Sequence, residues 1–123
     1  MTTTTTNLGI TKIEPDQSGA YAVVNTALDN IDKAIAGRLA LDLTGLTSKT
    51  LSGAESTNHI LHVTATTAAC ELVLQAVPKT WLVVNDGTHH VTIARSGQSG
   101  APMVPAGAAK QLLCDGINVR TIA

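Results

Sequence analysis

Four histidines are the residues of this 123-residue chain best suited to hold a metal ion or transfer protons. His59 and His62 stand three apart in an expected strand, and His89 and His90 are adjacent. Because strand side chains alternate between the two faces, neither pair can hold one ion by itself. A site would require His62 to meet His89 on a paired strand, or one histidine to meet its copies on a symmetry axis. We therefore expect no metal and no cofactor.

Carboxylates also fail to form a pair suited to acid–base chemistry. Asp29, Asp32 and Glu14 come nearest to a carboxylate cluster. Asp29 and Asp32 share one face of an expected helix outside its apolar seam, so these two are expected to be solvated. General acid–base catalysis needs a carboxyl group with a displaced pKa in a cleft, and no spacing here suggests one. Nucleophile-elbow, zinc-protease, P-loop and dinucleotide-binding motifs are missing from the sequence. We therefore predict no catalytic residues and a protein that is not an enzyme.

Trp81 and Tyr21 are the only aromatic residues, and the two cysteines are Cys70 and Cys114. A sugar site would need an exposed aromatic ring, but Trp81 lies in an apolar run and is expected in the core. The cysteines are not in metal-binding spacing. We expect buried thiols, with a disulfide as the alternative.

The composition points to a chain that covers part of its surface with other subunits. Hydrophobic residues make up 44% and charged residues 14%, with a net charge of −1, so little charge is available for the surface. The scattered Lys and Arg residues argue against nucleic-acid binding, and no apolar run is long enough for a membrane span. The start lacks the features of a secretory signal, so assembly in a cytoplasm is expected.

Residues 20–37 form the clearest helix. Their apolar residues are spaced by three and four, which is a heptad pattern; they are Tyr21, Val24, Leu28, Ile31 and Ile35. Leu28 at an a position with β-branched residues at d favours trimers or tetramers over a parallel dimer. Two interpretations remain open: the helix packs on its own domain, or it joins a bundle about a symmetry axis.

The remainder, residues 39–123, reads as one β domain. Leu39, Leu41 and Leu43 alternate with polar residues, and further β-type runs follow at 59–65, 71–77, 80–85, 90–94, 110–114 and 118–122. Turn signals recur about every ten residues, and Asp86-Gly87 and Asp115-Gly116 suit tight hairpins. We therefore predict a mainly β protein: an antiparallel β-sandwich or barrel-like domain with a short N-terminal helical stem, expected to be trimeric.

Residues 1–19 form an extended arm and loop that cannot make a core. The first seven are almost pure Thr, which suits either a floppy start or a strand added to a partner. The apolar side chains that a partner would bury, and thus the expected attachment residues, are Leu8, Ile10 and Ile13.

Two stretches resemble recurring sequences of tailed-bacteriophage fibre, spike and decoration proteins. Residues 7–37 are similar to the start of many phage fibre chains, through Leu8, Thr11-Lys12, Pro15, Asn25 and Ile31-Asp32. Residues 81–123 resemble a small β module of phage structural proteins, through Val83-Val84-Asn85, Val91-Thr92-Ile93, Val104-Pro105-Ala106-Gly107, Cys114-Asp115-Gly116 and Val119.

The resemblance implies a place in the virion, threefold symmetry, assembly in the host cytoplasm, and attachment of the N-terminal region to a capsid or tail structural protein. Phage fibres with this start usually continue for hundreds of residues to a receptor-binding tip, whereas this chain carries one β module. The leading hypothesis is therefore a non-enzymatic, homotrimeric capsid decoration, head spike or fibre adaptor. The alternative is a receptor- or glycan-binding tail-fibre module.

Overall fold

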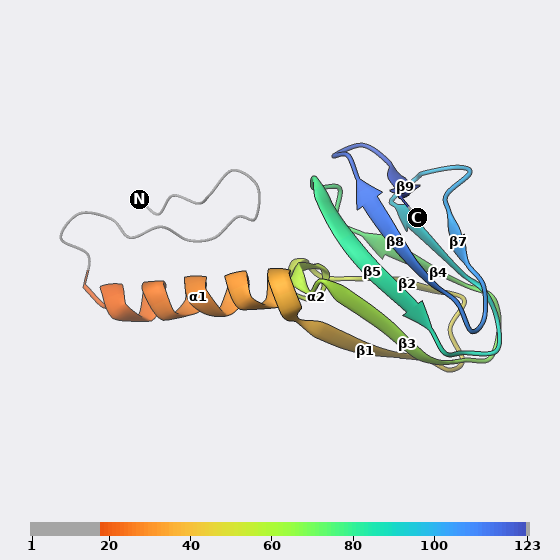
Figure 1. Ribbon diagram of the computed structural model, residues 1–123, viewed down its shortest axis with the longest axis horizontal. Helices are drawn as coiled ribbons and strands as arrows, with labels where there is room; N and C mark the ends of the chain where they lie inside the picture. The colour runs from red at the N-terminus through yellow and green to blue at the C-terminus, as the bar shows by residue number, and fades with distance from the viewer. Residues whose placement is uncertain (1–17, 123) are drawn as a thin grey trace.

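The computed structural model describes residues 18–122, which form a two-sheet β domain and one long helix (Figure 1). Helix α1 (Ala20–Ala36) projects away from the β domain, and a short helix α2 (Gly53–Thr57) lies at their junction. The mainly β fold with an N-terminal helix is as predicted.

The nine strands within residues 18–122 divide between two open sheets. The five-stranded sheet contains, in spatial order, β1 (Arg38–Leu43), β3 (Ile60–Thr66), β5 (Lys79–Asn85), β8 (Ala109–Cys114) and β9 (Val119–Thr121). The four-stranded sheet contains β2 (Ser48–Thr50), β4 (Cys70–Leu74), β6 (Val91–Arg95) and β7 (Met103–Val104).

The chain winds between these sheets like a solenoid, and this corrects the antiparallel pairing expected from the sequence. Each strand from β1 to β5 is followed by one in the opposite sheet, so neighbours within a sheet are one coil apart and run parallel. Among the strands of the described residues, antiparallel pairs occur only where β7, β8 and β9 close the stack. Leu39, Leu61 and Val83 share one row of the five-stranded sheet, at intervals of 22 residues.

The two Asp-Gly turns show why turn signals in the sequence led to the wrong expectation of strand pairing. Asp115-Gly116 joins antiparallel β8 and β9, with Gly116 at φ 95°, so this hairpin is confirmed. Asp86-Gly87 instead turns the chain from one sheet to the other. There the Gly87 N–H donates to Asn85 Oδ1 (2.9 Å), and a Cβ on Gly87 would lie 2.6 Å from Thr66 Oγ1. Glycine is required at position 87 because the Thr66 side chain leaves no room for a Cβ, not because the chain forms a hairpin there.

The core lies between the sheets and is almost wholly aliphatic. Trp81 is its largest member and is 0% exposed; its Nε1–H donates to the carbonyl oxygen of Ser56 in α2 (2.9 Å). A capping box between Ser52 and Glu55 stabilises the start of α2. Cys70 and Cys114 are buried in this core as free thiols, as expected, and burial raises the pKa of the Cys70 thiol.

Candidate functional site

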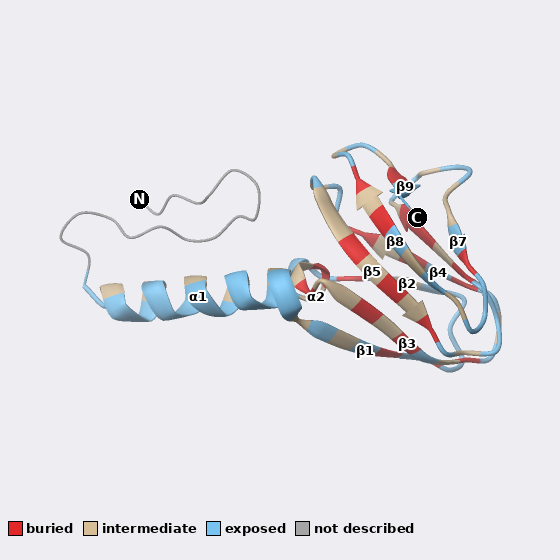
Figure 2. Cartoon of the chain, in the orientation of Figure 1, coloured by how far each residue is buried: buried red, intermediate tan, exposed pale blue. Residues whose placement is uncertain are grey.

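The apolar stripe of α1 is the most conspicuous surface of the molecule. No residue of the helix is buried, and Figure 2 shows α1 exposed along its length. The five predicted interface side chains are exposed as follows: Tyr21 77%, Val24 40%, Leu28 58%, Ile31 40% and Ile35 71%. Of the two interpretations left open by the sequence, packing of the helix on its own domain is therefore not what the structure of the single chain shows.

The geometry of α1 suits association along its axis. Its 17 residues span about 25 Å, and the 3–4 spacing places the stripe on one side of that length. Asp29 and Asp32 are exposed, as predicted. The helix ends at Gly37, whose N–H donates to the Lys33 carbonyl (2.9 Å), and β1 begins at the next residue. The stripe therefore ends close to the first strand of the five-stranded sheet.

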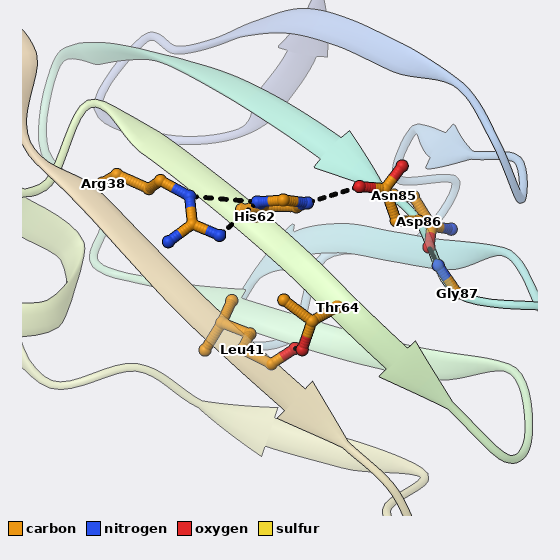
Figure 3. A network of polar contacts seen from close by, with 7 residues as sticks. All are labelled: Arg38, Leu41, His62, Thr64, Asn85, Asp86 and Gly87. Carbon is orange, nitrogen blue, oxygen red and sulfur yellow. Dashed lines mark hydrogen bonds and ion pairs between the residues drawn. The ribbon is translucent and has the colours of Figure 1, made fainter.

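A polar network on the outer face of that sheet was not predicted from the sequence. The Arg38 guanidinium donates to His62 Nδ1 from Nε (3.0 Å) and Nη2 (2.6 Å), while His62 Nε2 lies 2.5 Å from Asp86 Oδ2 (Figure 3). Because arginine only donates, His62 Nδ1 accepts these bonds, and the Nε2–H donates a hydrogen bond to Asp86 Oδ2. Both ring nitrogens are occupied, so this histidine has no free nitrogen with which to activate a nucleophile.

The neighbouring contacts in Figure 3 hold the strands that carry this network. The ladder between β1 and β3 shifts register after Leu41, leaving Thr64 as an extra residue, and its hydroxyl donates to the Leu41 carbonyl (3.1 Å). Asn85 is fully buried, and its amide donates to the carbonyl oxygens of His89 and Val104. These interactions stabilise strand ends and loops.

His62 and His89, the pair that a shared site would need, contact different residues. His89 Nδ1 contacts Thr88 Oγ1 (3.0 Å), whereas His62 is occupied by Arg38 and Asp86. Across residues 18–122, no group of three or more His, Cys, Asp or Glu side chains is arranged to hold a metal ion.

Trp81 does not offer a surface for a sugar ring. Its side chain is enclosed in the core, and Lys79 Nζ lies 5.3 Å from its ring centroid. Burial lowers the pKa of the Lys79 ammonium group. The prediction that Trp81 belongs to the core is confirmed.

Two further observations concern partners. Among the helices that the structure describes, none is both long and apolar enough to cross a membrane. The predicted attachment residues Leu8, Ile10 and Ile13 lie outside the described residues.

Comparison with known proteins gives no relative for this chain. No family model, no curated protein and no solved structure matches it.

Proposed function

We propose that this chain is a non-enzymatic structural protein of a tailed-bacteriophage particle, a homotrimer joined along α1 and attached by its N-terminal region to the capsid or tail. It would serve as a capsid decoration, a head spike or a fibre adaptor. The main support for the proposal is the exposed stripe of α1. Five large apolar side chains are exposed on this helix, and such a patch in water marks a surface that binds a partner.

The identity of that partner follows from the heptad register. Leu28 at an a position between Val24 and Ile31 at d positions favours three or four strands over two. A helix of this length is marginal in water unless its apolar face is packed. A bundle of identical helices satisfies this requirement for every copy at once.

The place in a phage particle is supported by the resemblance of residues 7–37 and 81–123 to phage structural proteins. A Thr-rich segment with Leu8, Ile10 and Ile13 suits attachment, because it gains stability only where another surface supplies hydrogen bonds and apolar contacts.

Substitution within the stripe tests the trimer. Light scattering of the purified chain should give three times 12.6 kDa. Leu28→Asp would place three carboxylates near the axis and should dissociate the trimer, whereas Thr26→Asp on the opposite side of α1 should leave the mass unchanged. A wild-type protein that is monomeric at micromolar concentration would overturn the proposal, and a stable dimer would overturn the register argument.

Attachment is tested on particles. A chain lacking residues 1–13 should still fold and form the trimer but should be absent from purified particles, where the full-length chain is found by labelling and electron microscopy. Normal occupancy of the truncated chain would place attachment in the β domain instead.

A further inference from the structure

The outer face of the five-stranded sheet carries a second group of apolar side chains that the described residues cover only in part. Alternate residues of its strands point into the core, so those between them point outward. The register places Ile60 beside Leu82, His62 beside Val84, and Thr80 beside Leu113 on this outer side. Ile122, which is 50% exposed, extends the face past Gln111. In Figure 1 no described helix or strand lies over this face.

The arrangement of side chains on this face resembles the anatomy of a subunit interface. Its middle strands carry the large aliphatic residues Ile60, Leu82, Val84 and Leu113, interspersed with His62, Thr80 and Gln111, while the edge strands β1 and β9 carry Arg38, Asp42 and Arg120. An apolar centre with a polar rim is the usual pattern of protein–protein contacts. The opposite outer face, on the four-stranded sheet, places Glu71 beside Thr92 at its centre and is more polar.

The sequence of strand β5 is typical of a strand that is covered on both of its faces. Residues 81–84 are apolar without a break, whereas a strand with one solvated face normally alternates apolar and polar residues. Trp81 and Val83 account for the inner side. Leu82 and Val84 are only partly shielded by the chain itself.

The histidine within this face can also be covered without leaving an unpaired ring nitrogen. His62 lies between Ala40 and Val84 in one row, and both its ring nitrogens already have partners in Arg38 and Asp86. Burying a polar side chain is costly chiefly when its hydrogen bonds are unmade.

We propose that this outer face, centred on Leu82, packs against the same face of other copies of the chain and completes the interface begun by α1. The inference rests on the proposed homotrimer. A standard interface uses about 20–30 residues on each side, and the stripe of α1 supplies five large apolar ones. Only Gly37 separates α1 from β1, so a bundle of α1 helices brings this sheet of each copy toward the others. The rim carries both signs of charge, which suits contact between identical copies.

Charge reversal at one position tests self-packing. Leu82→Lys and Leu82→Glu should each weaken association at least about tenfold, because like charges would meet at the interface. Mixing the two variants should restore part of the association, because every mixed trimer then contains opposite charges, although two of its three positions still carry the same one. The matched controls are Thr92→Lys and Thr92→Glu on the outer face of the four-stranded sheet, which should leave the mass unchanged. Dissociation by each Leu82 variant without recovery on mixing would show that the face packs on a different surface and overturn self-packing.

Footprinting of the wild-type chain gives a measurement that does not depend on the folding of a variant. Hydroxyl-radical labelling of Leu82, Leu113 and Ile122 should rise when the protein is diluted below its dissociation constant for self-association, while labelling of Met103 on the other sheet should stay constant. Unchanged labelling of the three residues, or Leu82 variants that associate as the wild type does, would overturn the inference. If the outer-face inference is overturned but Leu28→Asp still dissociates the protein, the proposed trimer remains, held together by α1 alone. A wild-type monomer would overturn both.

Discussion

Helix α1 and the β domain are built from the same aliphatic residues but differ in what covers them. In the β domain, the inward side chains of the coils are buried by the opposite sheet, and most are fully buried. In α1, an equally regular stripe is exposed from Tyr21 to Ile35. Within the β domain, each sheet covers the apolar inner face of the other, because the chain returns to each sheet once per coil. The helix has no second layer among the described residues.

This difference shows what a hydrophobic pattern specifies. The 3–4 spacing determines that a helix presents one apolar side, but it does not determine where the covering surface comes from. A core formed within the chain stabilises the monomer. An uncovered stripe instead links the stability of the helix to protein concentration. Substitutions that weaken only the core of the β domain, or only the stripe of α1, therefore test this difference directly.

The two aromatic residues offer the largest contrast. Trp81→Ala would leave a large cavity and remove the donor to the Ser56 carbonyl, so it should lower the free energy of unfolding by about 3–5 kcal/mol. Tyr21→Ala alters an exposed position on α1 and should change β-domain stability by less than about 0.5 kcal/mol, while weakening oligomerisation. Urea unfolding followed by far-UV circular dichroism measures both variants. Equal losses would contradict the separation of helix and β domain.

Gly37 tests the junction between the two regions. A Cβ at this position would lie 2.6 Å from the Lys33 carbonyl oxygen and 2.6 Å from Asn58 Oδ1. Gly37→Ala should therefore cost about 1–3 kcal/mol and loosen the last turn of α1, where the Lys33 carbonyl also accepts from the His59 N–H (3.1 Å). The expected signature is reduced helical circular dichroism with little change in Trp81 fluorescence.

Gly53→Ala is the matched control for this substitution. Gly53 begins α2 and has open space around a new Cβ, so alanine should be neutral or stabilise by up to about 1 kcal/mol. A comparable loss at both glycines would show that the contact with Lys33 is not the cause.

The sequence predicted the elements well because their signals are local. Helix α1, the strand at 59–65 and the burial of Trp81 follow from spacing and apolar runs. The parallel winding was missed because a turn such as Asp86-Gly87 is compatible with both a hairpin and a corner between sheets. The 22-residue interval that relates Leu39, Leu61 and Val83 is a signal that could have revealed it. It is weak because the equivalent positions share apolar character more than residue identity.

The candidate surfaces were predictable to different degrees. The stripe of α1 lies within 15 consecutive residues, so its spacing was sufficient to identify it. The Arg38–His62–Asp86 network joins residues 24 positions apart, and only the strand register brings them together. The same holds for the outer sheet face. The apolar run at 81–84 indicated that both sides of that strand are apolar, but pairing decided which residues stand beside Leu82.

The smallest expected effect concerns the hairpin that closes the β stack. Hydrogen bonds from the backbone N–H groups of Asn118 (2.8 Å) and Ile117 (2.9 Å) hold the pKa of the Asp115 carboxyl below its ordinary value of 3.8, and Arg120 adds to this. A carboxyl with a lowered pKa in the folded state stabilises it above the unfolded pKa, and this contribution is lost as the pH falls through the folded value.

The urea midpoint of the wild type should therefore exceed that of Asp115→Asn at pH 6 by a small margin, and the margin should shrink as the pH falls below about 3.8. Arg120→Gln should lower the midpoint less than Asp115→Asn, because it leaves both N–H bonds in place. A margin independent of pH would show that the carboxylate charge does not stabilise this turn. A larger effect from Arg120→Gln would make the ion pair, and not the backbone hydrogen bonds, the dominant interaction of the hairpin.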